Sequence, residues 1–234
     1  MFLDFDGCLV DLAPTPDAAR VPRGLPPLLH RVHRLAGGAL ALVSGRPVAQ
    51  LRAFLPGLHC MMVGSHGAER WDGQGAVARA AVNPETLAGV KARAAEIIGT
   101  TPGLIFEDKP VAVGLHYRGA PQHFDRLQAE AETLIADSSG FHLHHGKMVM
   151  ELRPNGIGKG HAVEALMRRA PFRGRSPVMM GDDATDEPAF AIANAHGGVS
   201  VKVGPGPTCA TRRVGSPAQV RHLLTTLASR LEAG

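Results

Sequence analysis

The sequence predicts an α/β protein in which a Rossmann-like core with a parallel sheet is interrupted by an inserted α+β domain. Three observations lead to this fold class. Short apolar runs alternate with amphipathic helical segments in both halves of the chain, an order that is typical of a parallel sheet. A central stretch instead has the order αββαββ, with two expected hairpins. The length of 234 residues accommodates one such core and one small insert.

The first part of the core is expected to cover residues 1–81. Its apolar runs are too short for helices and are bounded by Gly and Asp residues, so they predict buried strands. Apolar residues at helical spacing lie between them, and Pro47 favours the first turn of a further helix. The elements expected here are strands over 1–5 and 39–43, helices over 25–35 and 47–55, and a short strand before Gly64.

The insert is expected to cover residues 82–154. Asn83 and Pro84 are typical of a helix start, and Asp108-Lys109-Pro110 is typical of a hairpin turn. The pattern predicts helices over 84–98 and 121–136, and strands over 104–107, 111–118, 141–145 and 147–153.

The core is expected to resume over residues 155–234 with the same alternation as before. Ser216 and Pro217 are typical of the start of a C-terminal amphipathic helix. The other elements expected here are a helix over 158–170, a strand over 178–180, a helix from Pro188 and a strand over 199–203.

Composition excludes several classes of protein. The formal net charge of +4 could suggest a nucleic-acid binder, but aromatic residues are only 4% and the basic residues form no long run. No apolar run approaches the roughly 20 residues of a membrane span, and the N-terminus does not resemble a signal peptide. The three cysteines form no CxxC pair, which fits a reducing compartment. We therefore expect a cytoplasmic protein without nucleic-acid or membrane partners.

Chemistry-bearing side chains follow the expected strands. Asp4 and Asp6 lie at the end of the first strand, and a second acidic cluster at 182–187 follows a later one. Ser44 follows another strand, and Lys159 lies at a helix start. Each has a simpler explanation alone, as a helix cap, a turn residue or a surface lysine. Together, at the edge where α/β sheets bind ligands, they favour metal-assisted phosphoryl transfer.

Four segments in this order resemble the motifs of the haloacid dehalogenase (HAD) superfamily of phosphatases: Asp-Phe-Asp-Gly at 4–7, Ser-Gly-Arg at 44–46, Lys159, and Gly-Asp-Asp-x-x-Asp at 181–186. The insert is similar to the C2-type cap of that superfamily. The resemblance implies that Asp4 is the nucleophile of an aspartyl-phosphate route, and that Asp6 is first the general acid and then the base. It implies that Ser44 and Lys159 hold the phosphoryl oxygens.

The same resemblance implies a bound Mg²⁺. Its expected ligands are Asp4, the backbone carbonyl of Asp6, and Asp182. Asp183 is the next candidate in the metal site, and it and Asp186 would support these ligands or coordinate through water. The cap would close over the substrate, with hinges near residues 82 and 154.

Other segments resemble the trehalose-6-phosphate phosphatase family more narrowly. They are Gly-Ser-His-Gly-Ala-Glu at 64–69, Leu-His-Tyr-Arg at 115–118, and the spacing of Lys147, Glu151, Arg153 and Pro154. The resemblance implies a sugar-phosphate substrate, trehalose 6-phosphate, whose distal glucose is held by Arg118, Lys147 and Glu151. A solvated sheet face with cross-strand ion pairs is the alternative for these three.

Three further residues are expected near the substrate. Arg46 would orient the phosphate, or only pack against acids. His66 and Glu69 would contact the substrate, or form a buried hydrogen-bonded pair.

Alternative functions remain open from the sequence. A HAD phosphatase could act on another sugar phosphate, of the sucrose, mannosylglycerate or hexose phosphate type. A non-catalytic sugar-phosphate sensor is disfavoured by the intact Asp4, Asp6, Lys159 and Asp182. A trehalose-phosphate synthase on a separate chain is a possible partner, and the sequence does not decide between monomer and dimer.

Overall fold

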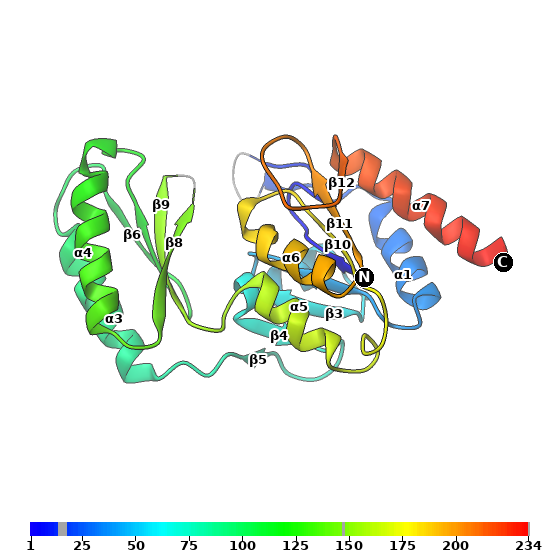
Figure 1. Cartoon of the computed structure of the whole chain (residues 1–234), viewed down its shortest axis with the longest axis horizontal. Coiled ribbons are helices and arrows are strands. Elements are labelled where there is room, and N and C mark those ends of the chain that lie inside the picture. The colour runs from blue at the N-terminus through cyan, green and yellow to red at the C-terminus, as the bar shows by residue number, and fades with distance from the viewer. Residues whose placement is uncertain (14–17, 147, 234) are drawn as a thin grey trace. The chain divides into compact units, whose positions relative to one another are not determined.

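The structure, a computed structural model, describes residues 1–13, 18–146 and 148–233, and it consists of two compact units (Figure 1). The first unit comprises Met1–Arg79 and Gly158–Gly234, and the second comprises Ala80–Ile157. The chain therefore passes out of the first unit after Arg79 and re-enters it at Gly158, close to where the sequence pattern changes.

The first unit is built on an eight-stranded sheet with the order β12-β11-β10-β1-β2-β3-β4-β5. Neighbouring strands from β12 to β3 are parallel, and β4 and β5 extend the sheet as antiparallel strands. The strands are β1 (Phe2–Leu3), β2 (Ala41–Val43), β3 (Met61–Gly64), β4 (Glu69–Trp71), β5 (Ala78–Arg79), β10 (Val178–Gly181), β11 (Val199–Val203) and β12 (Arg212–Val214). The predicted α/β class is confirmed, although β4, β5 and β12 are short strands that the sequence pattern does not predict.

Helices cover both faces of this sheet. Alternate residues of a strand point to opposite faces, so Leu3 packs into the core with α1, α2 and α7, while Phe2 packs into the core with α5 and α6. Helices α1 and α7 lie side by side in Figure 1, and Arg31 of α1 binds Glu232 of α7. The helices are α1 (Leu25–Leu35), α2 (Val48–Phe54), α5 (Lys159–Met167), α6 (Glu187–Ala195) and α7 (Pro217–Ala233).

The second unit has the order αββαββ, as predicted. Its antiparallel sheet has the strand order β6-β7-β9-β8, and α3 and α4 pack on one face of it (Figure 1). The Asn83 side chain caps α3 by accepting from the amides of Glu85 and Thr86. The elements are α3 (Pro84–Ile98), β6 (Ile105–Asp108), β7 (Val113–His116), α4 (Phe124–Asp137), β8 (Phe141–Gly146) and β9 (Val149–Pro154).

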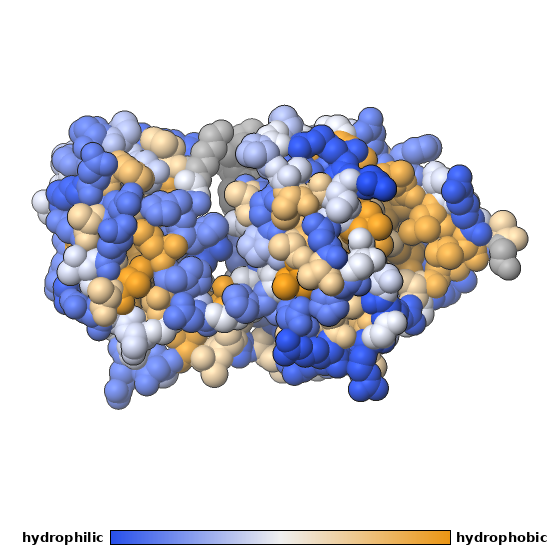
Figure 2. Space-filling view, viewed as in Figure 1, coloured by the Kyte–Doolittle hydropathy of each residue, from blue (hydrophilic) through white to orange (hydrophobic). Residues whose placement is uncertain are grey.

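Apolar side chains also reach the surface, notably on α7. Leu223, Leu227 and Leu231 recur every fourth residue and are exposed, and orange residues gather over α1 and α7 in Figure 2. Within the described ranges, none of the helices combines the length and the apolar character that crossing a membrane requires.

Alanine substitutions at two glycines are expected to change the stability of the protein in opposite directions. A Cβ on Gly160 of α5 would lie 2.8 Å from Pro188 Cβ and 3.0 Å from the Pro188 carbonyl carbon, so Gly160→Ala forces α5 and α6 apart. We expect it to lower the free energy of unfolding by about 1–3 kcal/mol. Gly89 of α3 has open space around it, so Gly89→Ala should raise stability by about 0.5–1 kcal/mol. Denaturant unfolding measures both, and a neutral Gly160→Ala would contradict the close helix contact.

Candidate active site

The expected catalytic side chains of the first unit lie where neighbouring parallel strands end. Asp4 follows β1, Ser44 follows β2 and Asp182 follows β10, and these three strands are adjacent in the sheet. The Asp4 amide donates to the Met180 carbonyl at 2.9 Å, so the pairing of β1 with β10 extends to the first acid. Lys159 is the first residue of α5. The sheet therefore brings these residues together at the edge where α/β proteins bind ligands.

A buried ammonium joins two aspartates at this edge. Lys159 Nζ lies 2.9 Å from Asp4 Oδ1 and 2.7 Å from Asp186 Oδ1. The three side chains are only 3%, 5% and 0% exposed, respectively. The other oxygen of Asp186 accepts from the backbone amides of Asp182 and Asp183, at 3.0 Å and 3.1 Å. Asp186 thus fixes both the lysine and the loop that carries Asp182.

Two glycines allow the carboxylates to approach the backbone this closely. A Cβ on Gly181 would collide with the Asp186 carboxylate, and a Cβ on Gly7 would collide with that of Asp182. Gly7 also has φ +70°, a left-handed conformation that favours glycine. The glycines of the two acidic motifs are therefore required by the packing of the acids themselves.

The cluster holds more negative charge than one lysine can neutralise. Burial raises the pKa of Asp4 well above its usual value, against the opposing effect of Lys159. Burial and the neighbouring Asp186 raise the pKa of Asp182 to about 6. Burial disfavours the charged form of Lys159, but the carboxylates of Asp4 and Asp186 outweigh this effect and raise its pKa. A second positive charge would relieve the repulsion between these carboxylates.

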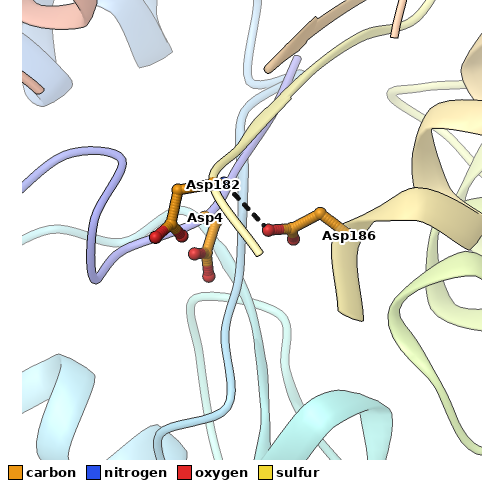
Figure 3. A group of neighbouring side chains, drawn as sticks. All are labelled: Asp4, Asp182 and Asp186. Carbon is orange, nitrogen blue, oxygen red and sulfur yellow. Dashed lines mark hydrogen bonds between the residues drawn. The ribbon is translucent and has the colours of Figure 1, made fainter. Parts of the chain in front are cut away.

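The donor atoms fit a divalent cation. Oxygen atoms of Asp4, Asp182 and Asp186 all lie within 4.8 Å of one another, and Figure 3 shows Asp4, after β1, close to Asp182 and Asp186 of the segment that follows β10. Carboxylate oxygens are the ligands that hard divalent cations prefer. In the part of the chain that the structure describes, Asp183 is outside this group: its exposed carboxylate instead accepts from the Ala184 amide at 2.6 Å.

The Asp6 carboxylate is held by Arg46. Arg46 Nε and Nη2 donate to the two carboxylate oxygens at 2.6 Å and 2.7 Å. The Arg46 amide donates to Ser44 Oγ at 3.2 Å, and Ser44 is buried. Strand β1 ends at Leu3, so the backbone after it is free to turn Asp6 toward the loop that follows β2. Asp4 and Asp6 therefore point to different partners.

His66 lies against the loop that follows β2. Its amide donates to the Ser44 carbonyl at 3.0 Å, and a Cβ on Gly45 would lie only 2.6 Å from two atoms of the imidazole. Ser65 and His66 both have positive φ, at 48° and 54°, which is an uncommon conformation for residues other than glycine. Backbone strain of this kind is typical of functional segments.

Glu69 is buried beneath the same loop. Its carboxylate accepts from the Val48 amide at 2.8 Å, at the start of α2, and from Arg79 at 3.3 Å. The negative charge at the N-terminus of α2 stabilises the helix and fixes the loop that precedes it.

In the second unit, Glu151 lies at the centre of a charged network on the β-sheet. Its two carboxylate oxygens accept from Lys109 and Arg153, and Lys109 also lies 3.5 Å from Glu107. Arg118 is exposed and follows the end of β7 at His116, so it lies beyond the strand in which the sequence pattern places it.

Lys147 lies outside the described residues.

Two lysines of these networks are not found by the sequence reasoning. Lys109 lies in a segment whose Asp and Pro predict only a turn. Lys202 is buried in β11 and donates to the Asp182 carbonyl, which helps to hold the loop that carries Asp182. The available signal for Lys202 is that Ser200 and Lys202 alternate with valines in an otherwise apolar strand.

Two solved structures show which class of fold the chain has. The C-terminal domain of Candida albicans trehalose-6-phosphate phosphatase matches with a TM-score of 0.81 at 24% identity, over 97% of this chain and 91% of that one. A trehalose-6-phosphate phosphatase related protein matches with a TM-score of 0.70 at 29% identity, over 97% and 96% of the two chains. The fold is therefore that of the HAD-type phosphatases.

Sequence comparison identifies the family. The family model described as Trehalose-phosphatase matches residues 2–221. Trehalose-6-phosphate phosphatase of Escherichia coli K12 is 38% identical over 231 residues, covering 99% of this chain and 87% of that protein. A probable trehalose-phosphate phosphatase of Sinorhizobium fredii is 41% identical over 217 residues, covering 92% and 81%. The chain belongs to the trehalose-phosphatase family.

Asp186→Asn tests the buried cluster without reference to activity. The amide removes one negative charge and places N–H donors opposite Lys159 or the backbone amides, so a buried ammonium loses one of its two carboxylates. We expect the metal-free protein to lose about 3–5 kcal/mol of its unfolding free energy. Asp183→Asn is the matched control, because an exposed Asn also caps a helix turn and should change stability by less than about 0.5 kcal/mol. Urea unfolding in chelator measures both, and equal effects would contradict the account.

Proposed function

We propose that the chain is a Mg²⁺-dependent phosphatase that hydrolyses trehalose 6-phosphate to trehalose and inorganic phosphate. The observation that carries this proposal is the buried Asp4 carboxylate, 2.9 Å from Lys159 Nζ at the carboxyl edge of the parallel sheet. A positioned carboxylate nucleophile, a fixed cation and further acidic ligands are the parts that metal-assisted phosphoryl transfer requires. Membership of the trehalose-phosphatase family, and the name of the E. coli relative, support the substrate.

The metal would be held by Asp4, Asp182 and the backbone carbonyl of Asp6. Asp183 is a further candidate ligand through water, and Asp186 supports the others through Lys159 and the amides it binds. The ion, when bound, supplies positive charge that offsets the negative charge of the phosphoryl oxygens and of the acids. Lys159 provides the second fixed positive charge of the site.

In the first step, Asp4 attacks the phosphorus atom of the substrate. A bond forms between an Asp4 carboxylate oxygen and phosphorus as the bond from phosphorus to the sugar oxygen breaks. Asp6 gives its proton to that departing oxygen, so trehalose leaves as a neutral alcohol. Lys159 and the Ser44 hydroxyl hold the phosphoryl oxygens. The Ser44 Oγ already accepts the Arg46 amide, so its own O–H is available to donate to the phosphate.

In the second step, water replaces Asp4 on phosphorus. Asp6, now a carboxylate, takes a proton from the attacking water, and the bond between phosphorus and the Asp4 oxygen breaks. Phosphate leaves, and both the Asp4 carboxylate and the protonated Asp6 are restored. One displacement is thereby divided into two easier ones.

Recognition of the sugar is proposed for side chains of both units. In the second unit these are Arg118, Lys147 and Glu151, of which Glu151 is held by Lys109 and Arg153. In the first unit they are His66, which follows β3 and packs against the loop after Ser44, and Glu69, which acts on the substrate indirectly by fixing that loop.

A panel of sugar phosphates tests the function. With Mg²⁺, phosphate release from trehalose 6-phosphate should greatly exceed that from glucose 6-phosphate, because a monosaccharide cannot fill the proposed sugar site. It should also greatly exceed that from sucrose 6-phosphate, because a disaccharide of glucose and fructose does not present two glucose rings to that site. A chelator should abolish the activity, and Asp4→Asn should reduce it to background. Equal rates on all three sugars would contradict the substrate, and an active Asp4→Asn would contradict the nucleophile.

Metal binding should depend on pH. Because the pKa of Asp182 is raised to about 6 in the metal-free protein, its carboxyl holds a proton below that pH, and this proton must leave before a cation binds. The affinity for Mg²⁺ should therefore fall by about tenfold or more for each pH unit below about 6. Calorimetric titration at pH 7.5 and pH 5 measures this change. Equal affinities at the two pH values would refute the prediction.

A further inference from the structure

A bidentate ion pair joins two loops of the proposed site. Arg46 Nε donates to Asp6 Oδ2 at 2.6 Å, and Arg46 Nη2 donates to Asp6 Oδ1 at 2.7 Å. Two parallel hydrogen bonds fix both the position and the plane of a carboxylate, which a single ammonium cannot do. The loop after β2 therefore sets the direction of a side chain in the loop after β1.

The Arg46 guanidinium is itself held in place. Its Cζ lies 5.0 Å from the ring centroid of Phe54 and 5.7 Å from that of Phe5, and these two rings are 5.6 Å apart. Nη1 also donates to Gln50 Oε1 at 3.3 Å. Stacking on aromatic rings and this third donor contact orient the guanidinium before any substrate arrives. The arginine is a rigid support for the carboxylate.

The two partners differ in exposure. The Arg46 side chain is 8% exposed, whereas that of Asp6 is 29% exposed. Carboxylate oxygens carry about four lone-pair sites, so Asp6 can accept two bonds from Arg46 and still meet a ligand. A substrate that reaches this loop therefore meets Asp6, while most of Arg46 is covered by protein.

We propose that Arg46 is a positioning residue that aims the Asp6 carboxylate at the leaving oxygen, an inference that rests on the proposed function of Asp6. Arg46 touches neither the phosphoryl group nor the sugar and acts only through Asp6. This role differs from the substrate contact that the sequence resemblance implies for Arg46.

The dependence of the rate on the leaving group distinguishes positioning of Asp6 by Arg46 from direct contact of Arg46 with the substrate. In wild type, Arg46→Gln and Arg46→Lys, kcat/KM is measured on trehalose 6-phosphate and on p-nitrophenyl phosphate, whose nitrophenolate leaves without needing a proton. Arg46→Gln should lower kcat/KM about 100-fold on the sugar phosphate and less than about threefold on the aryl phosphate. The inhibition constant of inorganic phosphate should not change. The constant kcat/KM includes only the steps up to the first irreversible bond cleavage. The later role of Asp6 as a base therefore does not affect it.

A double-mutant cycle tests whether Arg46 acts through Asp6. Asp6→Asn alone should show the same selective loss on trehalose 6-phosphate. Adding Arg46→Gln to Asp6→Asn should cost nothing further, because residues that act as one unit have strongly non-additive effects. Multiplied losses in the double variant would overturn the proposal.

Two controls guard against loss of the fold. Arg46→Lys keeps the buried positive charge but cannot make the two parallel bonds, so it should stay folded and still lose activity selectively on the sugar phosphate. Arg52→Gln removes an arginine from α2, the helix that follows the Arg46 loop, where it stacks on Trp71, and should leave the rates on both substrates unchanged. Equal losses on both substrates, together with weaker inhibition by inorganic phosphate, would instead show that Arg46 binds the phosphoryl group directly.

Absence of trehalose 6-phosphate hydrolysis in the wild type would contradict the proposed function. The same comparison of variants is then made on the alkyl phosphate that the wild type does cleave.

Discussion

The site depends first on one buried positive charge. Three carboxylates converge where β1 and β10 end, and such a group would be unstable in a protein interior without compensation. The Lys159 ammonium provides part of that compensation by binding both Asp4 and Asp186. Asp186 then uses its second oxygen to hold the amides at the head of the loop that carries Asp182. The placement of Asp4, the proposed nucleophile, and of Asp182, a proposed metal ligand, thus follows from a single buried cation.

A second set of contacts holds the other half of the site. Glu69 from β4 fixes the start of α2, and the loop just before that helix carries Ser44 and Arg46. Arg46 in turn holds Asp6, which belongs to the loop after β1. In each case a side chain from one loop satisfies a charged or backbone group of another. Preorganised contacts of this kind keep reacting groups in place without cost at the moment of reaction.

Much of this arrangement could be predicted from the sequence, because it depends on periodicity and on which residues follow strands. The alternation of elements gives the α/β core, and the acids and lysine of the site lie at strand and helix ends that the pattern locates. Side-chain direction after a strand ends could not be predicted: β1 stops at Leu3, so strand periodicity no longer governs Asp6. Likewise, β7 ends at His116, so strand periodicity does not determine the direction of the Arg118 side chain. Lys109 binds Glu151 across 42 residues of sequence, a pairing that only the sheet register creates.

The central claim is that the carboxylate held by Lys159 becomes the phosphorylated group. The most direct measurement is peptide mapping of enzyme that is quenched in acid during steady turnover of trehalose 6-phosphate. The account predicts a phosphoryl group on Asp4, and its loss when the quenched enzyme is treated with hydroxylamine, which cleaves acyl phosphates. A phosphoryl group on another residue, or none on the chain while the substrate is being hydrolysed, would contradict it.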